Sequence, residues 1–199
     1  SVLSRADFKA MTDIGTRQGV FEKDESKILK NLLVFNTVRA EDIMTPRTVV
    51  TSSSQETTIK EFYETYRNKL RFSRIPLYQN TKDDISSYFL KGDMLDKMIQ
   101  GKGDEPLKSI ARPLSIMNEK ILLPDLFNIL MEKREHIALV VDEFGGMAGV
   151  VTMEDVIETL LGTEIIDEMD GDADMQALAR KNWEKRARGL GLIGDEDVK

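Results

Sequence analysis

The sequence predicts a mixed α/β fold of the α+β kind, in which two βαββα units pack as a pseudo-two-fold pair, with an N-terminal helical arm and a C-terminal helix. Three observations support this prediction. The chain compared with itself shows two copies of a pattern of roughly 60 residues. In the residues before the first copy, apolar side chains recur with a helical period. One copy alone is too small to bury both faces of its sheet, so the two copies are expected to pack against each other.

The chain outside the two copies is predicted to be helical at both ends. In the N-terminal arm, residues 1–40, Ser4 and Asp7 have the spacing of a capping box, and Gly19 interrupts the helical pattern. We expect this arm to pack on another part of the protein. After the second copy, residues 163–199 are predicted to form an acidic turn and a C-terminal helical tail.

The first copy, residues 41–101, opens with a strand in "DIMTPRTVV" and continues with a helix in "TIKEFYETYRNKL". Two strands follow in "RFSRIPLY" and "ISSYFLK", and a helix in "GDMLDKMI" ends the copy. The second copy, residues 107–162, repeats this order in "SIARPLSIM", "LPDLFNILMEKR", "HIALVVD", "MAGVVT" and "MEDVIETLL". The segment "GKGDEP", with two glycines and a proline, is the predicted linker between the copies.

The two copies match in register. The offset between matching residues is 67 at Pro46 and Pro113, and it is 62 at Asp93 and Asp155. The second copy has therefore lost five residues between these anchors. Packing of two similar units creates clefts at their seam, and such seams are a usual place for small-molecule sites.

Composition excludes several classes of function. The 199 residues carry a formal net charge of −7, which argues against a nucleic-acid-binding protein because such a protein needs a concentrated basic face. With no cysteine and one histidine, the chain offers no Cys-based zinc site and no Ser-His-Asp or Cys-His set, so we expect neither an enzyme nor a metal held by the protein itself.

The chain has no apolar run near the ~20 residues that span a bilayer, so the fragment itself is expected to be soluble. Because it does not begin with Met, we expect it to be a piece of a longer protein, whose membrane part would lie outside this sequence.

Thr152 and Asp155 lie where the last strand of the second copy gives way to a helix. Their Thr-x-x-Asp spacing has two interpretations that do not exclude each other. One is a capping box with a first-turn acid, which needs no ligand. The other is a ligand site, in which the carboxylate accepts both hydroxyls of a ribose while the threonine and the helix N-terminus contact phosphate or sugar oxygens.

Phe72 and Arg74 share one face of the predicted strand "RFSRIPLY". A planar aromatic ring beside a guanidinium group would suit adenine and phosphate. The alternative is a core phenylalanine and an exposed arginine on an edge strand. His136 takes the place of Arg74 in the second copy and is either a surface residue at the start of a strand or a phosphate contact.

Three longer motifs carry a family resemblance. "EDIMTPR", "FSRIPLY" and "VVDEFGGMAGVVTMEDVIETLLGTEIIDEMD" resemble the CorC/CNNM family of magnesium and cobalt efflux proteins, and the repeats resemble that family's tandem cystathionine-β-synthase (CBS) domains, also called a Bateman module. The resemblance covers about Gly19 to Asp170. It implies a regulatory module on the cytoplasmic face of the cell (inner) membrane. Such a module binds ATP or AMP, controls a membrane-embedded efflux domain of the same full-length chain, and forms a homodimer.

The resemblance also implies one nucleotide site per chain. Phe72 and Ile75 would lie against adenine and Asp155 on the ribose, and the sugar and phosphates would be contacted by Thr45, Thr152 and Arg74. Mg²⁺ would be held mainly through the phosphates and water. The alternative is a purely structural dimerisation module whose Thr-x-x-Asp is only a helix cap.

A second cleft, related to the first by the repeat, is expected to be weaker. There Leu90 stands in the place of the threonine, and Ala111-Arg112-Pro113 stands in the place of Met-Thr-Pro. Asp93 and His136 remain as its only matching polar groups.

Overall fold

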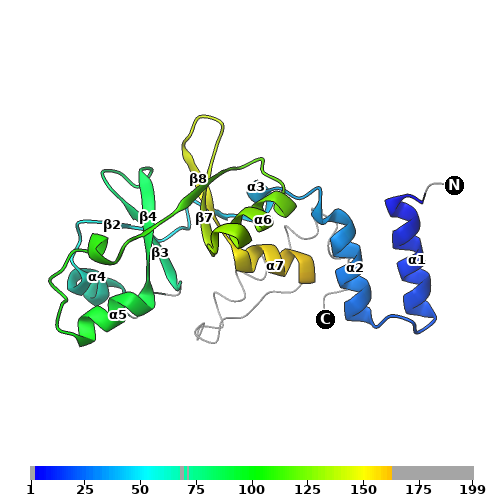
Figure 1. Cartoon of the computed structure of the whole chain (residues 1–199), viewed down its shortest axis with the longest axis horizontal. Coiled ribbons are helices and arrows are strands. Elements are labelled where there is room, and N and C mark those ends of the chain that lie inside the picture. Colours follow the sequence, from blue (N-terminus) through cyan, green and yellow to red (C-terminus); the bar gives the residue numbers. More distant parts are fainter. Residues whose placement is uncertain (1–2, 68–69, 71, 163–199) are drawn as a thin grey trace. The chain divides into compact units, whose positions relative to one another are not determined.

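The computed structural model describes residues 3–67, 70 and 72–162 (Figure 1). The predicted acidic turn and C-terminal helical tail lie outside the described residues. The mixed α/β fold is confirmed, and the chain forms two units. The helical unit holds the described residues of 3–43, 120–136 and 152–162, and the sheet unit holds the described residues of 44–119 and 137–151. This division does not follow the two sequence copies, because the second copy gives its strands to one unit and its helices to the other.

The helical unit contains the N-terminal arm and both helices of the second copy. Its helices are α1 (Arg5–Arg17), α2 (Lys23–Phe35), α3 (Ala40–Ile43), α6 (Leu123–Lys133) and α7 (Met153–Leu161). At the start of α1 the predicted capping box is present: the Asp7 N–H donates to Ser4 Oγ at 3.2 Å, and the Ser4 N–H donates to Asp7 Oδ2 at 2.7 Å. Local sequence therefore defines where α1 begins.

Helices α1 and α2 lie side by side as an antiparallel hairpin (Figure 1). The Arg5 guanidinium donates to the Leu33 carbonyl at 2.9 Å, and Lys30 Nζ lies 2.5 Å from Asp13 Oδ1. The hydrogen bond from Lys30 lowers the pKa of Asp13 below its usual value. Because Gly15 has no side chain, the Phe21 ring can pack where a Cβ would stand.

The arm joins the rest of the helical unit through α2. Asn31 on α2 is 1% exposed, and its Nδ2 donates to the Leu160 carbonyl in the last turn of α7 at 3.1 Å. Beyond α2, the Ala40 N–H donates to the Ile121 carbonyl, and the Leu123 N–H donates to the Val38 carbonyl. The Asn31 amide thus satisfies the Leu160 carbonyl, which lies in the last turn of α7 where carbonyls lack partners within their own helix.

The sheet unit holds two four-stranded sheets, one in the order β1-β8-β7-β6 and the other in the order β2-β3-β4-β5. The strands are β1 (Thr45–Pro46), β2 (Ser53–Ser54), β3 (Arg74–Tyr78), β4 (Ile85–Leu90), β5 (Arg112–Pro113), β6 (Ser115–Asn118), β7 (Ile137–Val141) and β8 (Met147–Thr152). The short edge strands β1 and β5 are exchanged, so each sheet has three strands from one copy and one edge strand from the other. This exchange links the two copies.

The strand register repeats between the sheets. Pro46 of β1 lies opposite Gly149 of β8, and Pro113 of β5 lies opposite Ser87 of β4, both in antiparallel pairs. The prolines differ by 67 positions and their partners by 62, which are the two offsets found in the sequence. The exchanged strands are therefore structural equivalents.

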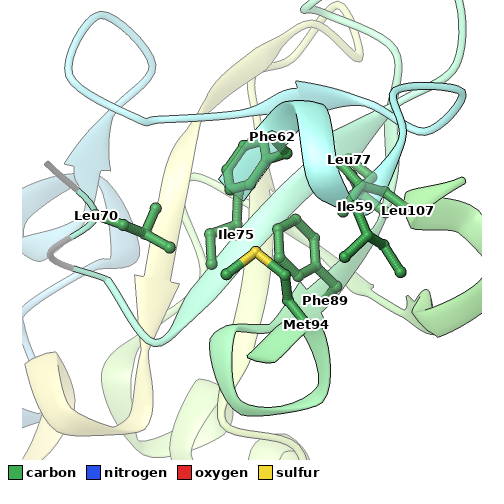
Figure 2. Packing of buried hydrophobic residues seen from close by; sticks show 8 residues of the cluster. All are labelled: Ile59, Phe62, Leu70, Ile75, Leu77, Phe89, Met94 and Leu107. Carbon is green, nitrogen blue, oxygen red and sulfur yellow. The ribbon is translucent and has the colours of Figure 1, made fainter. Parts of the chain in front are cut away.

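Two apolar clusters stabilise the sheet unit. The first packs the helices α4 (Ile59–Tyr66) and α5 (Lys91–Ile99) and the 3₁₀ turn η1 (Leu107–Ile110) on β3 and β4. Figure 2 shows its members: Ile59, Phe62, Leu70, Ile75, Leu77, Phe89, Met94 and Leu107. Within it, the rings of Phe62 and Phe89 lie edge to face with their centroids 5.2 Å apart, a favourable geometry for aromatic pairs. The second cluster joins the two sheets through Ile85, Tyr88, Leu114, Ile137, Leu139, Met147 and Val150.

Two elements of the first copy are shorter than the sequence predicts. The predicted helix in "TIKEFYETYRNKL" ends as α4 at Tyr66, and the strand in "RFSRIPLY" begins at Arg74. Leu70 belongs to the first apolar cluster although it lies beyond the helix. Its N–H donates to the Tyr66 carbonyl at 2.9 Å, so it stays tied to the end of α4.

We expect Gly162→Ala to destabilise the protein more than Gly101→Ala does. Both glycines have φ near +70°, so each alanine meets the left-handed penalty of about 1–2 kcal/mol. A Cβ on Gly101 would meet open space, whereas a Cβ on Gly162 would overlap the Asn31 amide and Lys27 Cε. Thermal unfolding of both variants measures the difference, and equal melting temperatures would show that the α2–α7 contact is loose.

We expect Gly149→Ala to lower the free energy of unfolding by about 1–3 kcal/mol, the usual cost of overpacking. A Cβ at this position would overlap the Thr45 carbonyl of β1. Gly92→Ala is the matched control, because nothing lies near its Cβ in α5 and a helical alanine gains about 0.5–1 kcal/mol over glycine. Urea denaturation of both variants gives the two values. A stable Gly149→Ala would mean that β1 does not need this close approach.

Candidate functional site

The start of α7 forms the most complete polar arrangement among the predicted site residues. Asp155 Oδ2 accepts the Thr152 N–H at 2.7 Å and the Thr152 hydroxyl at 2.8 Å, and the Asp155 N–H donates to Thr152 Oγ1 at 3.2 Å. Both side chains are half-buried. The capping-box interpretation is therefore confirmed, and the carboxylate is held beside the positive end of the helix dipole.

Thr45 belongs to β1, which is held close to β8. It lies opposite Val150, two residues before Thr152, and its carbonyl packs on Gly149, where any side chain would overlap it. The glycine therefore fixes the position of the "MTP" segment against the strand that leads into α7. Thr45 itself is half-buried.

The "FSRIP" residues lie at the start of β3. Phe72 is 48% exposed, and Arg74 is half-buried and paired with Leu90 of β4. The core-phenylalanine part of the alternative is wrong, because Phe72 lies outside both apolar clusters. Arg74 lies at the end of β3, beyond the residues that pair with β2. Ile75 is 0% exposed within the first apolar cluster (Figure 2), so its contact with adenine stays a prediction while its packing role is plain.

The six residues of the predicted nucleotide site come from both units. Thr45, Phe72, Arg74 and Ile75 lie in the sheet unit, and Thr152 and Asp155 lie in the helical unit. Within the sheet unit, the exposed Phe72 lies two positions before Arg74, the first residue of β3. Within the helical unit, Thr152 and Asp155 are joined by three hydrogen bonds.

The residues of the predicted second cleft are arranged differently. Asp93 in the first turn of α5 accepts from Arg112 of β5, with Nη2 at 2.8 Å and Nε at 3.2 Å from Oδ2. The N-cap of α5 is Leu90, which makes no side-chain cap. His136 is exposed, and its carbonyl accepts the Met153 N–H at 2.9 Å. In the sequence Arg112 stands out only as a departure from Met-Thr-Pro, and its contact with Asp93 is not predicted. The available signal is a first-turn acid without a capping threonine, because such a carboxylate needs another donor.

The described residues contain no group of three or more His, Cys, Asp or Glu side chains that could hold a metal ion. None of the helices in the same part of the chain is both long and apolar enough to cross a membrane.

Comparisons with known proteins agree with this architecture. The CBS domain family model matches residues 108–162. A UPF0053 protein of Synechocystis is 36% identical over 189 residues, which is 95% of this chain and 54% of the relative. The chain spans about half the length of the curated relatives it matches.

Two solved structures are similar over most of the chain. One is the CBS domain of the bacterial CNNM/CorC family Mg²⁺ transporter, at 31% identity and a TM-score of 0.73, covering 83% of this chain and all of that one. Another, described as that domain in complex with ATP, has 34% identity and a TM-score of 0.66, and covers 71% of this chain and 99% of that one. With two CBS-type repeats, exchanged edge strands and these similarities, the chain belongs to the CBS domains of the CNNM/CorC family of Mg²⁺ transporters.

Proposed function

We propose that this chain is a nucleotide-sensing CBS pair that binds ATP or AMP, with Mg²⁺ held mainly by the phosphates, and that controls the membrane-embedded Mg²⁺ and cobalt efflux domain of a longer protein. The observation that carries the proposal is the carboxylate of Asp155, fixed by Thr152 at the N-terminus of α7. Further support comes from the similar structure described as a complex with ATP, which is 34% identical to this chain.

Each residue has a chemical role in the proposal. The Asp155 carboxylate accepts the two ribose hydroxyls as charge-assisted hydrogen bonds. Phe72 offers its exposed ring, just before β3, to adenine, and Ile75 of β3 is the second proposed adenine contact. Arg74 neutralises phosphate charge, and the hydroxyls of Thr45 and Thr152 bind sugar or phosphate oxygens.

Mg²⁺ enters the proposal as a partner of the nucleotide. Mg²⁺ keeps several water ligands and usually binds protein sites through substrate phosphates with few carboxylates. An ATP-bound ion of this kind needs no dedicated cluster of side chains. Mg²⁺ is also the ion that the family transports, so a module that binds Mg²⁺ with ATP would respond to the cargo of the efflux domain.

Regulation would follow from population shift. A ligand moves an equilibrium between two arrangements only by its differential affinity for them. In our proposal the module forms a homodimer on the cytoplasmic side of the inner membrane, and the α1–α2 arm connects it to the membrane domain. The chain is proposed to have no enzyme activity and to act by binding alone.

A purely structural dimerisation module is the second candidate. The observation that favours it is the capping box itself, in which Thr152 donates its N–H and its hydroxyl to Asp155 Oδ2 without any ligand. A thermal-shift series with ATP, ADP, AMP and S-adenosylmethionine, each with and without Mg²⁺, separates the candidates. Ligand that binds only the folded chain raises its melting temperature, so no rise at millimolar nucleotide would favour the structural candidate.

We expect Asp155→Asn to weaken ATP binding at least about tenfold, because the ribose loses charge-assisted hydrogen bonds. The amide oxygen can still accept the Thr152 N–H, so the melting temperature should change little. Asp125→Ala, which removes an exposed first-turn carboxylate of α6, is the control and should leave affinity unchanged. Titration calorimetry measures both. Unchanged affinity in Asp155→Asn would remove this residue from the site.

We expect Arg74→Ala to weaken ATP binding about ten- to a hundredfold while adenosine binding changes much less. The reason is that the guanidinium group contacts phosphates, which adenosine lacks. Calorimetry with ATP, AMP and adenosine on the same variant gives the comparison. An equal loss for all three ligands would assign Arg74 a structural role at the start of β3.

A further inference from the structure

The two exchanged edge strands carry different residues at the same structural position. Thr45 of β1 lies opposite Val150 of β8, and Arg112 of β5 lies opposite Tyr88 of β4. These pairs are related by the offsets of 67 and 62 residues that relate the two copies. Arg112 is therefore the counterpart of Thr45, and by the second offset Asp93 is the counterpart of Asp155.

The two equivalent aspartates have different partners. Asp155 Oδ2 accepts the hydroxyl and the N–H of Thr152, which caps its own helix. Asp93 has Leu90 at that N-cap position, and its Oδ2 accepts two N–H groups of Arg112 instead, at 2.8 and 3.2 Å. A threonine side chain has only one donor, its hydroxyl, whereas the guanidinium group presents several N–H donors in a fixed fork.

The geometry points to Arg112 as an internal occupant of the position that a ribose would take at Asp93. A ribose offers a carboxylate two neutral hydroxyl donors, and Arg112 offers two N–H donors with a positive charge. We infer that this contact closes the Asp93 position to nucleotides and that Arg112, with Leu90, determines which of the two equivalent positions binds. The inference rests on the proposed function and deepens it, because it explains a stoichiometry of one nucleotide per chain.

The exposure of the ion pair sets how strongly it closes the position. The side chains of Arg112 and Asp93 are 48% and 33% exposed, and an exposed pair of this kind changes an equilibrium constant by only about two- to fivefold. Charge alone is thus a weak barrier. The bulk of Arg112 beside the carboxylate and the missing hydroxyl at Leu90 account for the rest, so replacing Arg112 alone opens the position in part and replacing both residues opens it further.

The test is the stoichiometry of ATP binding, measured by calorimetry with Mg²⁺ on the whole chain. We expect one ATP for the parent chain, a second and weaker event for Arg112→Thr, and a tighter second event for Arg112→Thr with Leu90→Thr. Adding Asp93→Ala to the double variant should abolish the second event. Arg47→Thr is the matched control: it removes the Arg47–Asp83 contact, an exposed ion pair in the same unit, and should leave one ATP per chain.

The outcomes separate this inference from the proposed function. Two ATP on the parent chain, or no second event in either Arg112 variant, overturns the role of Arg112. No binding to the parent chain with binding to the double variant contradicts the proposed function but supports the closing role of Arg112. Melting temperatures accompany each titration, and the single variant decides if the double variant does not fold.

Discussion

The exchange of edge strands is the constraint on which the rest of the sheet unit depends. β1 and β5 have two residues each, too few to form a stable pair alone, and each joins the last strand of the opposite copy. At β1 the exchange requires a glycine, because the Thr45 carbonyl occupies the place of any side chain on Gly149. A shared apolar cluster joins the two sheets behind these pairs. The copies thus stabilise one another.

Divergence between the copies has changed the polar groups more than the scaffold. The register of the exchanged strands is the same in both sheets, yet one helix begins with a threonine cap and the other with Leu90. Where the cap is lost, the first-turn carboxylate binds an arginine from the neighbouring strand. A small change at an N-cap therefore changes what a carboxylate contacts while leaving the backbone pairing intact.

Local features were predictable from the sequence, and long-range ones were less so. The capping boxes at Ser4 and at Thr152 have a fixed spacing, so the residues alone identify them. The strand exchange leaves no periodic signal, because two residues cannot show a period of two. The burial of Ile75 and the contact between Arg112 and Asp93 depend on which strands become neighbours. Spacing and chemistry single out Thr152, Asp155, Phe72 and Arg74, whereas Thr45 and Ile75 come from the motif resemblance alone. All six roles remain predictions.

The hydrogen bond between Asn31 and the Leu160 carbonyl spans 129 positions of the chain. Its consequence concerns the order of folding during synthesis. The α1–α2 hairpin closes through contacts much nearer in sequence, so it can form as soon as both helices have emerged. At translation rates of about 5–20 residues per second, α7 follows roughly ten seconds later. The arm is made before the two copies but completes its packing only after α7, and until then α2 lacks the helix that covers Asn31.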